Sequence, residues 1–130
     1  EDARESIVLV TSAKGLERKS NLLKKKFKKL KDKNVKIKIA APIDKDNLKI
    51  AKELSQFAEV RNTLRINARF IIADNKELVF MIMGEEETHP SYDVGIWIKS
   101  PFFANSLTNM FNVVWNNLED GKRVIAKLSK

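Results

Sequence analysis

The first half of the chain alternates between two spacings of its apolar residues. SIVLVT (6–11) is a continuous β-branched run, which predicts a buried strand. From 15 to 32 the apolar residues recur every three or four positions, which predicts a helix that buries one narrow stripe. VKIKIAAP (35–42) has the pattern of a second strand, DKDNLKIAKELSQF (44–57) that of a second helix with an aspartate as N-cap, and AEVRN (58–62) that of a third strand. Together they form a β-α-β-α-β series.

The second half begins with a predicted hairpin. ARFIIAD (68–74) and ELVFMIM (77–83) are two strands joined by the dipeptide Asn-Lys, whose asparagine favours the positive φ of a two-residue loop. After a polar, acidic loop, DVGIWIKSP (93–101) is a further strand, and FFANSLTNMFNVVWNNL (102–118) has the spacing of a third long helix. A short helix over 122–130 follows. The residues predicted to face the core from the third helix are Phe103, Leu107, Met110, Phe111, Val114 and Trp115.

The order of these elements, β-α-β-α-β-β-β-β-α, defines the expected fold class. Strands that alternate with helices need right-handed crossovers, so the first three strands should be parallel. The later hairpin adds antiparallel strands. We therefore expect an α/β fold, with one mixed β-sheet flanked by helices on both faces. A length of 130 residues fits a single domain over 1–130, and the start without Met indicates a fragment of a longer protein.

The composition, 43% hydrophobic and 32% charged, is typical of a globular domain. Because the chain has no cysteine, disulfides and thiolate metal sites are excluded. All of its apolar runs are shorter than a membrane span needs. We therefore expect a cytoplasmic protein with no metal, no cofactor and no membrane association.

The net charge of +8 is concentrated in one segment. Between 14 and 38 the chain has twelve Lys or Arg against Glu17 and Asp32, a local net charge of +10. One interpretation is a solvated helix face. The other is contact with DNA phosphates, which would be independent of base sequence and sensitive to salt. The segment lacks interleaved aromatics and a set of base-reading side chains, so the expected contact is a supporting one. The candidate phosphate contacts are Lys24, Lys25, Lys28 and Lys29.

NARFIIAD, at the start of the hairpin, contains three polar residues at a known spacing. The phospholipase D superfamily has a histidine, one spacer, a lysine, four spacers and an aspartate just inside such a hairpin, and this sequence has Asn67, Arg69 and Asp74 there. KGLERKSNLLKKKFKKLKDKNVKIKIAAPI and HPSYDVGIWIKSPFF resemble segments of the C-terminal phospholipase D-like domain of archaeal TrmB-type transcriptional regulators. The resemblance covers essentially the whole chain and implies a phospholipase D-like half-domain.

Two residues of the motif are changed, and the changes alter the chemistry that it can support. In the superfamily the histidine attacks phosphorus and forms a covalent phosphohistidine, whereas the amide of Asn67 is not a nucleophile. Arg69 keeps the positive charge and can bind an anion through two parallel hydrogen bonds. Asp74 could orient Asn67 or Arg69. We therefore expect no catalysis by the superfamily mechanism.

Four further residues are candidates for the same pocket. His89, the only histidine, lies with Tyr92 and Asp93 in the loop before the last predicted strand. These three are either surface turn residues or reach over Asn67 and Arg69. Trp97, on the strand itself, faces either the core or the pocket. If His89 replaced the missing nucleophile, the chain would be an active phosphodiesterase or nuclease, which is the alternative function.

The resemblance to TrmB-type regulators implies a role in transcription regulation. It predicts a non-catalytic domain that senses a ligand, dimerises, or does both, with a helix-turn-helix DNA-binding domain upstream of this fragment. A chain with one half-motif would complete a shared cleft as a homodimer. Paired arginines in that cleft favour a small anionic ligand, such as a phosphate or a carboxylate. A pure dimerisation module without a ligand is the third alternative.

Overall fold

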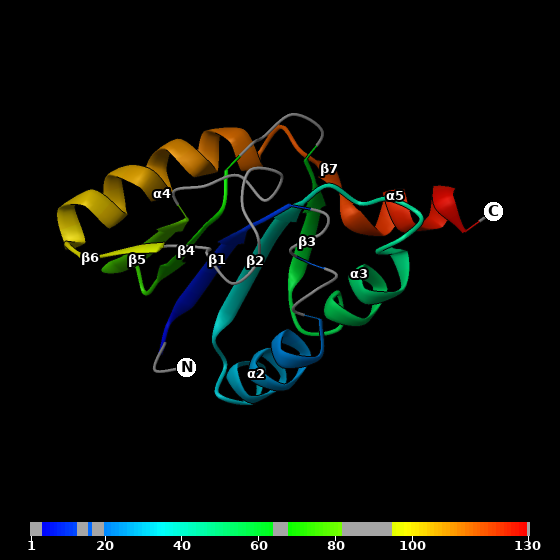
Figure 1. The fold of residues 1–130 in the computed structure, drawn as a ribbon, viewed down its shortest axis with the longest axis horizontal. Helices are drawn as coiled ribbons and strands as arrows, with labels where there is room; N and C mark the ends of the chain where they lie inside the picture. The colour runs from blue at the N-terminus through cyan, green and yellow to red at the C-terminus, as the bar shows by residue number, and fades with distance from the viewer. Residues whose placement is uncertain (1–3, 13–15, 17–19, 64–67, 82–94, 130) are drawn as a thin grey trace.

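The computed structural model describes residues 4–12, 16, 20–63, 68–81 and 95–129. Figure 1 shows a central sheet with helices on both of its sides. The elements follow in the order β1 (Ser6–Val10), α2 (Ser20–Asp32), β2 (Lys36–Ala41), α3 (Leu48–Leu54), β3 (Glu59–Asn62), β4 (Phe70–Ala73), β5 (Glu77–Met81), β6 (Gly95–Lys99), α4 (Pro101–Trp115), β7 (Glu119–Asp120) and α5 (Gly121–Leu128).

The strands form one mixed sheet in the order β6-β5-β4-β1-β2-β3-β7. β1 pairs with β2 and β2 with β3 in parallel, while β4, β5 and β6 continue from β1 as antiparallel neighbours. The predicted parallel series, the hairpin and the α/β class are therefore confirmed. The sequence does not predict β7, because a strand of two residues has no periodicity.

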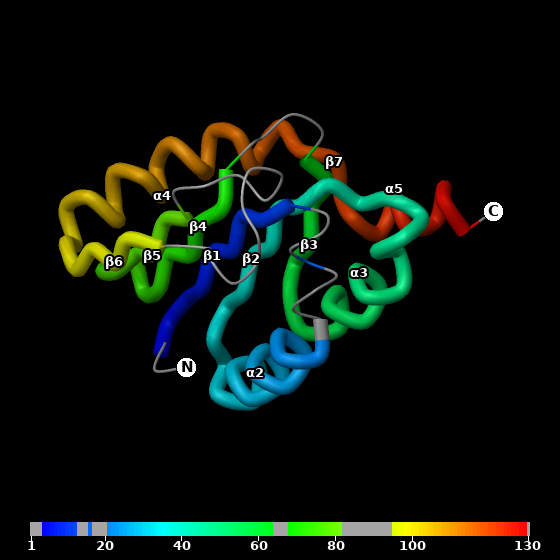
Figure 2. Tube along the Cα trace, viewed as in Figure 1, coloured from blue at the N-terminus to red at the C-terminus, as the bar shows by residue number. Residues whose placement is uncertain are grey.

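Alternate strand residues face opposite sides of the sheet, and each side has its own core. Ile7 and Leu9 of β1 belong to the cluster that packs under α2, α3 and α5. Val8 and Val10, between and after them, belong to the cluster under α4. Figure 2 shows α4 along one side of the sheet and α2 and α3 on the other.

The predicted buried side of α4 is wrong for three residues. Phe103, Met110 and Val114 are 43%, 69% and 40% exposed. Apolar residues surround most of this helix, so their spacing alone does not identify the row that faces the sheet. The row that packs on the sheet consists of Ala104, Leu107, Phe111 and Trp115.

Pro101 begins α4, whereas the sequence pattern assigns it to the end of the preceding strand. Ser100 is the N-cap, and its side chain accepts a hydrogen bond of 3.1 Å from the N–H of Phe103. The first turn of a helix tolerates proline because its missing N–H has no partner within the helix. Ser100 and Pro101 together therefore fix the point where β6 ends and α4 starts.

The β4–β5 turn also lies one residue earlier than predicted. Asp74 and Asn75 have φ values of 54° and 60°, and the N–H of Lys76 donates to the carbonyl of Ala73 at 3.0 Å. Positive φ at both central residues defines a turn that matches the twist of a hairpin. The central dipeptide is therefore Asp-Asn and not Asn-Lys, which places Asp74 in the turn and not on the strand.

Candidate functional site

The buried polar residues of the described chain gather at one end of the sheet. This end carries the carboxyl termini of β1, β2 and β3 and, because β4 runs antiparallel to β1, the start of β4. In open α/β sheets, ligands bind beyond the carboxyl ends of the strands. The buried polar residues are Thr11, Asn47, Asn62, Thr63 and Arg69, each at most 7% exposed.

Two of these five residues hold the loop that follows β2. The Asn62 side-chain oxygen accepts a hydrogen bond of 2.9 Å from the N–H of Ile43. Asn47 accepts from the N–H of Asp44 at 2.9 Å and donates to the carbonyl of Pro42 at 2.8 Å. Both side chains satisfy backbone groups that would otherwise be buried without partners. Their role is therefore structural.

Thr11 and Thr63 continue β1 and β3 by one residue. The N–H of Thr11 donates to the carbonyl of Ala40 and the N–H of Thr63 to that of Ala41, each at 3.1 Å. The Thr63 hydroxyl is fully buried, and its oxygen has no hydrogen-bond partner within the described structure. Such a group costs about 1–3 kcal/mol when it is left unsatisfied.

Arg69 lies beside Thr11 on the neighbouring strand. The β1–β4 register pairs Val10 with Phe70, and one step further it places Arg69 opposite Thr11. The carbonyl of Arg69 accepts a hydrogen bond of 2.9 Å from the N–H of Met81. Only 7% of Arg69 is exposed, and arginine remains charged at any physiological pH. The sheet end therefore contains a buried positive charge next to a hydroxyl.

Asp74 is not brought to Arg69, since the two residues flank opposite ends of β4, about 16 Å apart along an extended strand. Its carboxylate accepts hydrogen bonds from the backbone N–H groups of Arg4, Glu5 and Ser6 at 2.8–3.1 Å. Burial alone would raise the pKa of Asp74, but these three donors and the charge of Lys76 outweigh it and lower the pKa. Asp74 thus ties the start of β1 to the hairpin.

The remaining pocket candidates divide into two groups. Asn67, His89, Tyr92 and Asp93 lie outside the described residues. Trp97 is on β6 and is 68% exposed, so it is not a core residue. Its register through Val79 and Ile71 puts it on the same face of the sheet as Arg69, two strands away.

That face of β4, β5 and β6 is not covered by any helix of the described structure. The core cluster under α2, α3 and α5 contains no residue of these three strands. Ile71 is 39% exposed, and Val79 and Met81 are partly exposed. We refer to Ile71, Val79, Met81 and Trp97 as the apolar shelf. It adjoins the sheet end where Arg69 lies.

The lysines of α2 have unequal surroundings. Lys24 forms an ion pair of 2.9 Å with Glu53 of α3, and Lys31 donates a hydrogen bond to the carbonyl of Gln56. Both are therefore directed toward α3. Lys25, Lys28 and Lys29, in contrast, are exposed.

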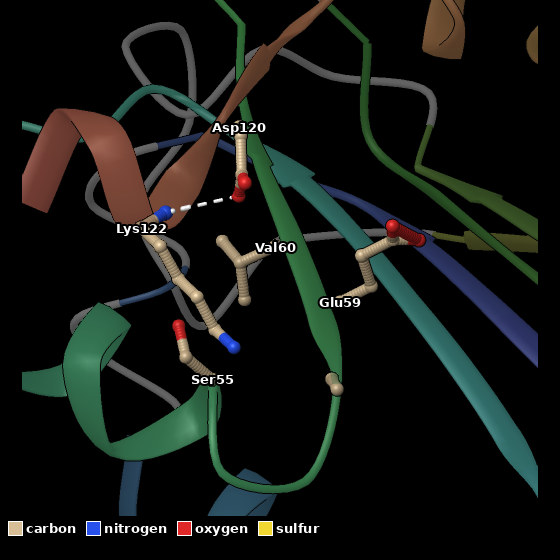
Figure 3. A pocket seen from close by; sticks show the side chains of 6 residues that line it. Ser55, Glu59, Val60, Asp120 and Lys122 are labelled. Carbon is tan, nitrogen blue, oxygen red and sulfur yellow. Dashed lines mark hydrogen bonds between the residues drawn. The ribbon is translucent and has the colours of Figure 1, made fainter.

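A separate hollow of about 250 Å³ lies between α3, β3 and α5 (Figure 3). The carboxylate of Asp120, on its rim, caps α5 by accepting a hydrogen bond of 3.1 Å from the N–H of Lys122. Glu59 is paired with Arg61 at 3.5 Å. Asp120 and Glu59 thus already have partners within the domain, and we assign no ligand to this hollow.

Two classes of feature are absent from the part of the chain that the structure describes. It contains no group of three or more His, Cys, Asp and Glu that could hold a metal ion. It also contains no helix that is long and apolar enough to cross a membrane.

Comparison with solved structures identifies this architecture as that of the phospholipase D fold. The phospholipase D family member Nuc from Salmonella typhimurium superimposes with a TM-score of 0.68 and 14% identity, over 92% of this chain and 83% of that one. TrmBL2, described as an archaeal chromatin protein with a novel mode of DNA binding, superimposes with a TM-score of 0.70 and 23% identity, over 92% of this chain. This chain covers only 46% of TrmBL2.

The family model of the EBD N-terminal subdomain of the transcriptional regulator TrmB matches residues 1–121. The chain therefore belongs to this family of transcriptional regulator domains. A search among curated proteins gives no match. The resemblance seen in the sequence is thus confirmed at the level of family, fold and regulatory role.

Proposed function

We propose that this domain is the non-catalytic, ligand-sensing part of a transcriptional regulator whose DNA-reading domain is a helix-turn-helix upstream of residue 1. The observation that carries the proposal is the buried polar pair at the sheet end, where Arg69 and Thr11 lie side by side beyond the parallel strands. Family membership supports the regulatory half of the proposal.

The proposed absence of catalysis rests on the chemistry of the motif. A phosphoryl intermediate needs a nucleophile, and Asn67 occupies the position of the superfamily histidine without being able to serve as one. Arg69 retains the charge of the superfamily lysine, so the motif keeps its capacity to bind an anion. Binding without turnover is what a sensor requires.

The proposed ligand is a small molecule with one phosphate or carboxylate group. A guanidinium can hold two oxygens of such a group, and a threonine hydroxyl can donate to a third. Because such an anion would bind only the folded protein, it would also stabilise the folded state. The apolar shelf beside Arg69 provides surface for the rest of the ligand.

A phosphate titration of thermal stability tests this proposal. Phosphate should raise the melting temperature of the wild type with a saturating dependence, because a ligand that binds only the folded state stabilises it. Arg69→Ala should abolish the saturating response, and Arg69→Lys should weaken it. The general stabilising effect of phosphate salts is common to all variants, so only the difference between them counts.

Thr63→Val is the matched control, because Thr63 is a buried polar residue at the same end of the sheet but lies three strands from Arg69. It preserves the shape of the side chain and removes the hydroxyl, so the free protein should be no less stable than the wild type, since a buried unsatisfied group is lost. The phosphate response should remain that of the wild type. An Arg69→Ala variant that responds to phosphate like the wild type would refute the proposed site.

We further propose that a second copy of the chain covers the apolar shelf. Exposed apolar residues on a sheet face are typical of interaction sites, and Trp97 is the most exposed of the four. In a twofold dimer the same surface packs on itself. Because the shelf adjoins Arg69, such a dimer would place two arginines near the interface, in agreement with a shared anion site.

A further inference from the structure

We infer that the outer face of α2 is a docking surface for the phosphate backbone of duplex DNA, distinct from the site at Arg69. The surface consists of Lys25, Lys28 and Lys29, which we call the lysine ridge. This function does not depend on ligand sensing and requires no base contacts.

The position of the ridge follows from the helical geometry of α2. Phe27 and Leu30 point into the core, and at 100° per residue Lys25, Lys28 and Lys29 lie on the opposite side of the helix. The three side chains are all exposed. Lys25 and Lys29 are one helical turn apart, about 6 Å along the axis. The ridge therefore projects its charges away from the protein in a compact row.

Few acidic residues lie near the lysine ridge to balance its positive charge. Like charges at i, i+3 and i, i+4 destabilise a helix by about 0.2–0.5 kcal/mol per pair. Lys24 is paired with Glu53, but the only acid within α2 is Asp32, one turn beyond Lys28 and Lys29. A sequence selected for stability alone would alternate lysine with glutamate on this face. The observed arrangement thus favours an external partner with negative charge.

The two faces of the domain differ in charge. α2 lies on the opposite side of the sheet from α4 (Figure 1). The sequence of α4, PFFANSLTNMFNVVW, contains no charged residue. A polyanion would therefore orient the domain with α2 toward it and α4 away from it.

Duplex DNA fits the ridge better than the other common polyanions. A helix that binds anionic membranes inserts its apolar side, but Phe27 and Leu30 are already buried in the core. Single-stranded nucleic acid needs exposed aromatics for stacking, and the ridge has none. Protein interfaces are depleted in lysine. Lysine point charges suit a regular row of phosphates that is contacted without regard to sequence.

Fluorescence anisotropy with a labelled duplex of arbitrary sequence tests the inference. If three phosphates are contacted, affinity should fall roughly 40-fold between about 50 and about 200 mM salt. Lys25→Gln, Lys28→Gln and Lys29→Gln together should lower the slope of log affinity against log salt by about three. Asp32→Asn should act in the opposite direction and strengthen binding.

The control is a second triple variant, which loses the same number of positive charges outside α2. Lys45→Gln, Lys99→Gln and Lys122→Gln remove three exposed lysines outside α2 and should leave DNA affinity within about twofold of the wild type. Equal losses in the two triple variants would show a net-charge effect and overturn the inference. So would a wild type that does not bind the duplex, or one that prefers phosphatidylserine vesicles to it. Arg69→Ala should retain DNA binding, which separates this test from that of the ligand site.

Discussion

Gly121 shows how a single residue can set the distance between two elements. It is the first residue of α5 and is buried against β3. A Cβ atom at this position would lie 2.5 Å from the carbonyl oxygen of Val60, which is backbone and cannot rotate away. The close contact of α5 with β3 therefore requires glycine for steric reasons alone.

Gly121→Ala should destabilise the domain by about 1–3 kcal/mol, since it forces α5 away from β3. Gly95→Ala is the comparison, because there the added Cβ would meet the side-chain ends of Met81 and Val79 at 3.1 Å, and the nearest backbone atom, the carbonyl oxygen of Phe80, at 3.3 Å. The side-chain ends can move and the backbone contact is 0.8 Å longer than at Gly121, so the cost should be clearly smaller than that of Gly121→Ala. Urea unfolding of both variants measures the difference. Equal stability of the two would contradict the assigned role of the α5–β3 contact.

Asp74 should make the free energy of unfolding of the domain depend on pH in the acidic range. Its pKa is lowered in the folded state from the ordinary value of 3.8, so the unfolded chain binds the proton more readily. The stabilisation is therefore complete above the unfolded pKa and is lost as the pH falls through the folded pKa. Asn tolerates the positive φ of this position, which makes Asp74→Asn a test of the charge alone.

Unfolding midpoints of the wild type and Asp74→Asn at pH 7 and at successively lower pH provide the measurement. The wild type should be the more stable at pH 7, and the two curves should converge as the pH falls below 3.8. Parallel curves would mean that the N–H groups of Arg4, Glu5 and Ser6 do not favour the charged carboxylate.

At the scale of elements, the sequence predicts the strands and helices where periodicity is unambiguous. The run that becomes β1 is apolar after its first residue, and that of β2 alternates Lys with Ile before it becomes wholly apolar, so both are recognisable as strands. The spacing of apolar residues does not predict the buried side of α4, because apolar residues occupy several sides of this helix and only packing on the sheet selects one. It also fails at Pro101, because a proline fits the first turn of a helix as well as the end of a strand.

The candidate site was only partly predictable. The spacing in NARFIIAD identifies Arg69, but it also suggests Asp74, which lies at the other end of β4 because the residues between them form an extended strand. The sequence does not single out Thr11 and Thr63, because single threonines at the end of a strand are common. Only their position could indicate a role, because both residues directly follow strands that the β-α-β-α-β order predicts to be parallel. Parallel strands bring their carboxyl ends together at one edge.

At the scale of the whole molecule, the described surface is divided by charge and polarity. The lysine ridge on α2 is cationic, α4 is uncharged, and the apolar shelf with Arg69 lies on the α2 side of β4, β5 and β6. If the shelf is the dimer contact, the two lysine ridges belong to one assembly. Two ridges on one duplex would multiply their weak individual affinities through effective concentration.

The dimer itself can be tested through Trp97. Sedimentation velocity over a range of concentrations should show a monomer–dimer equilibrium that phosphate shifts toward the dimer, since an anion between two arginines reduces their repulsion. Trp97→Ala should raise the dissociation constant about 30-fold, as expected for a tryptophan at the centre of an interface. Phe102→Ala is the matched control, because Phe102 is 82% exposed on α4, across the sheet from the shelf.

The control decides which apolar surface is used. If Phe102→Ala weakens the dimer and Trp97→Ala does not, the second copy packs on α4, and Arg69 of each subunit remains far from the interface. The phosphate response would then be independent of protein concentration. If only Trp97→Ala weakens the dimer, the response to phosphate should strengthen with concentration, because binding and association are linked through the same pair of arginines.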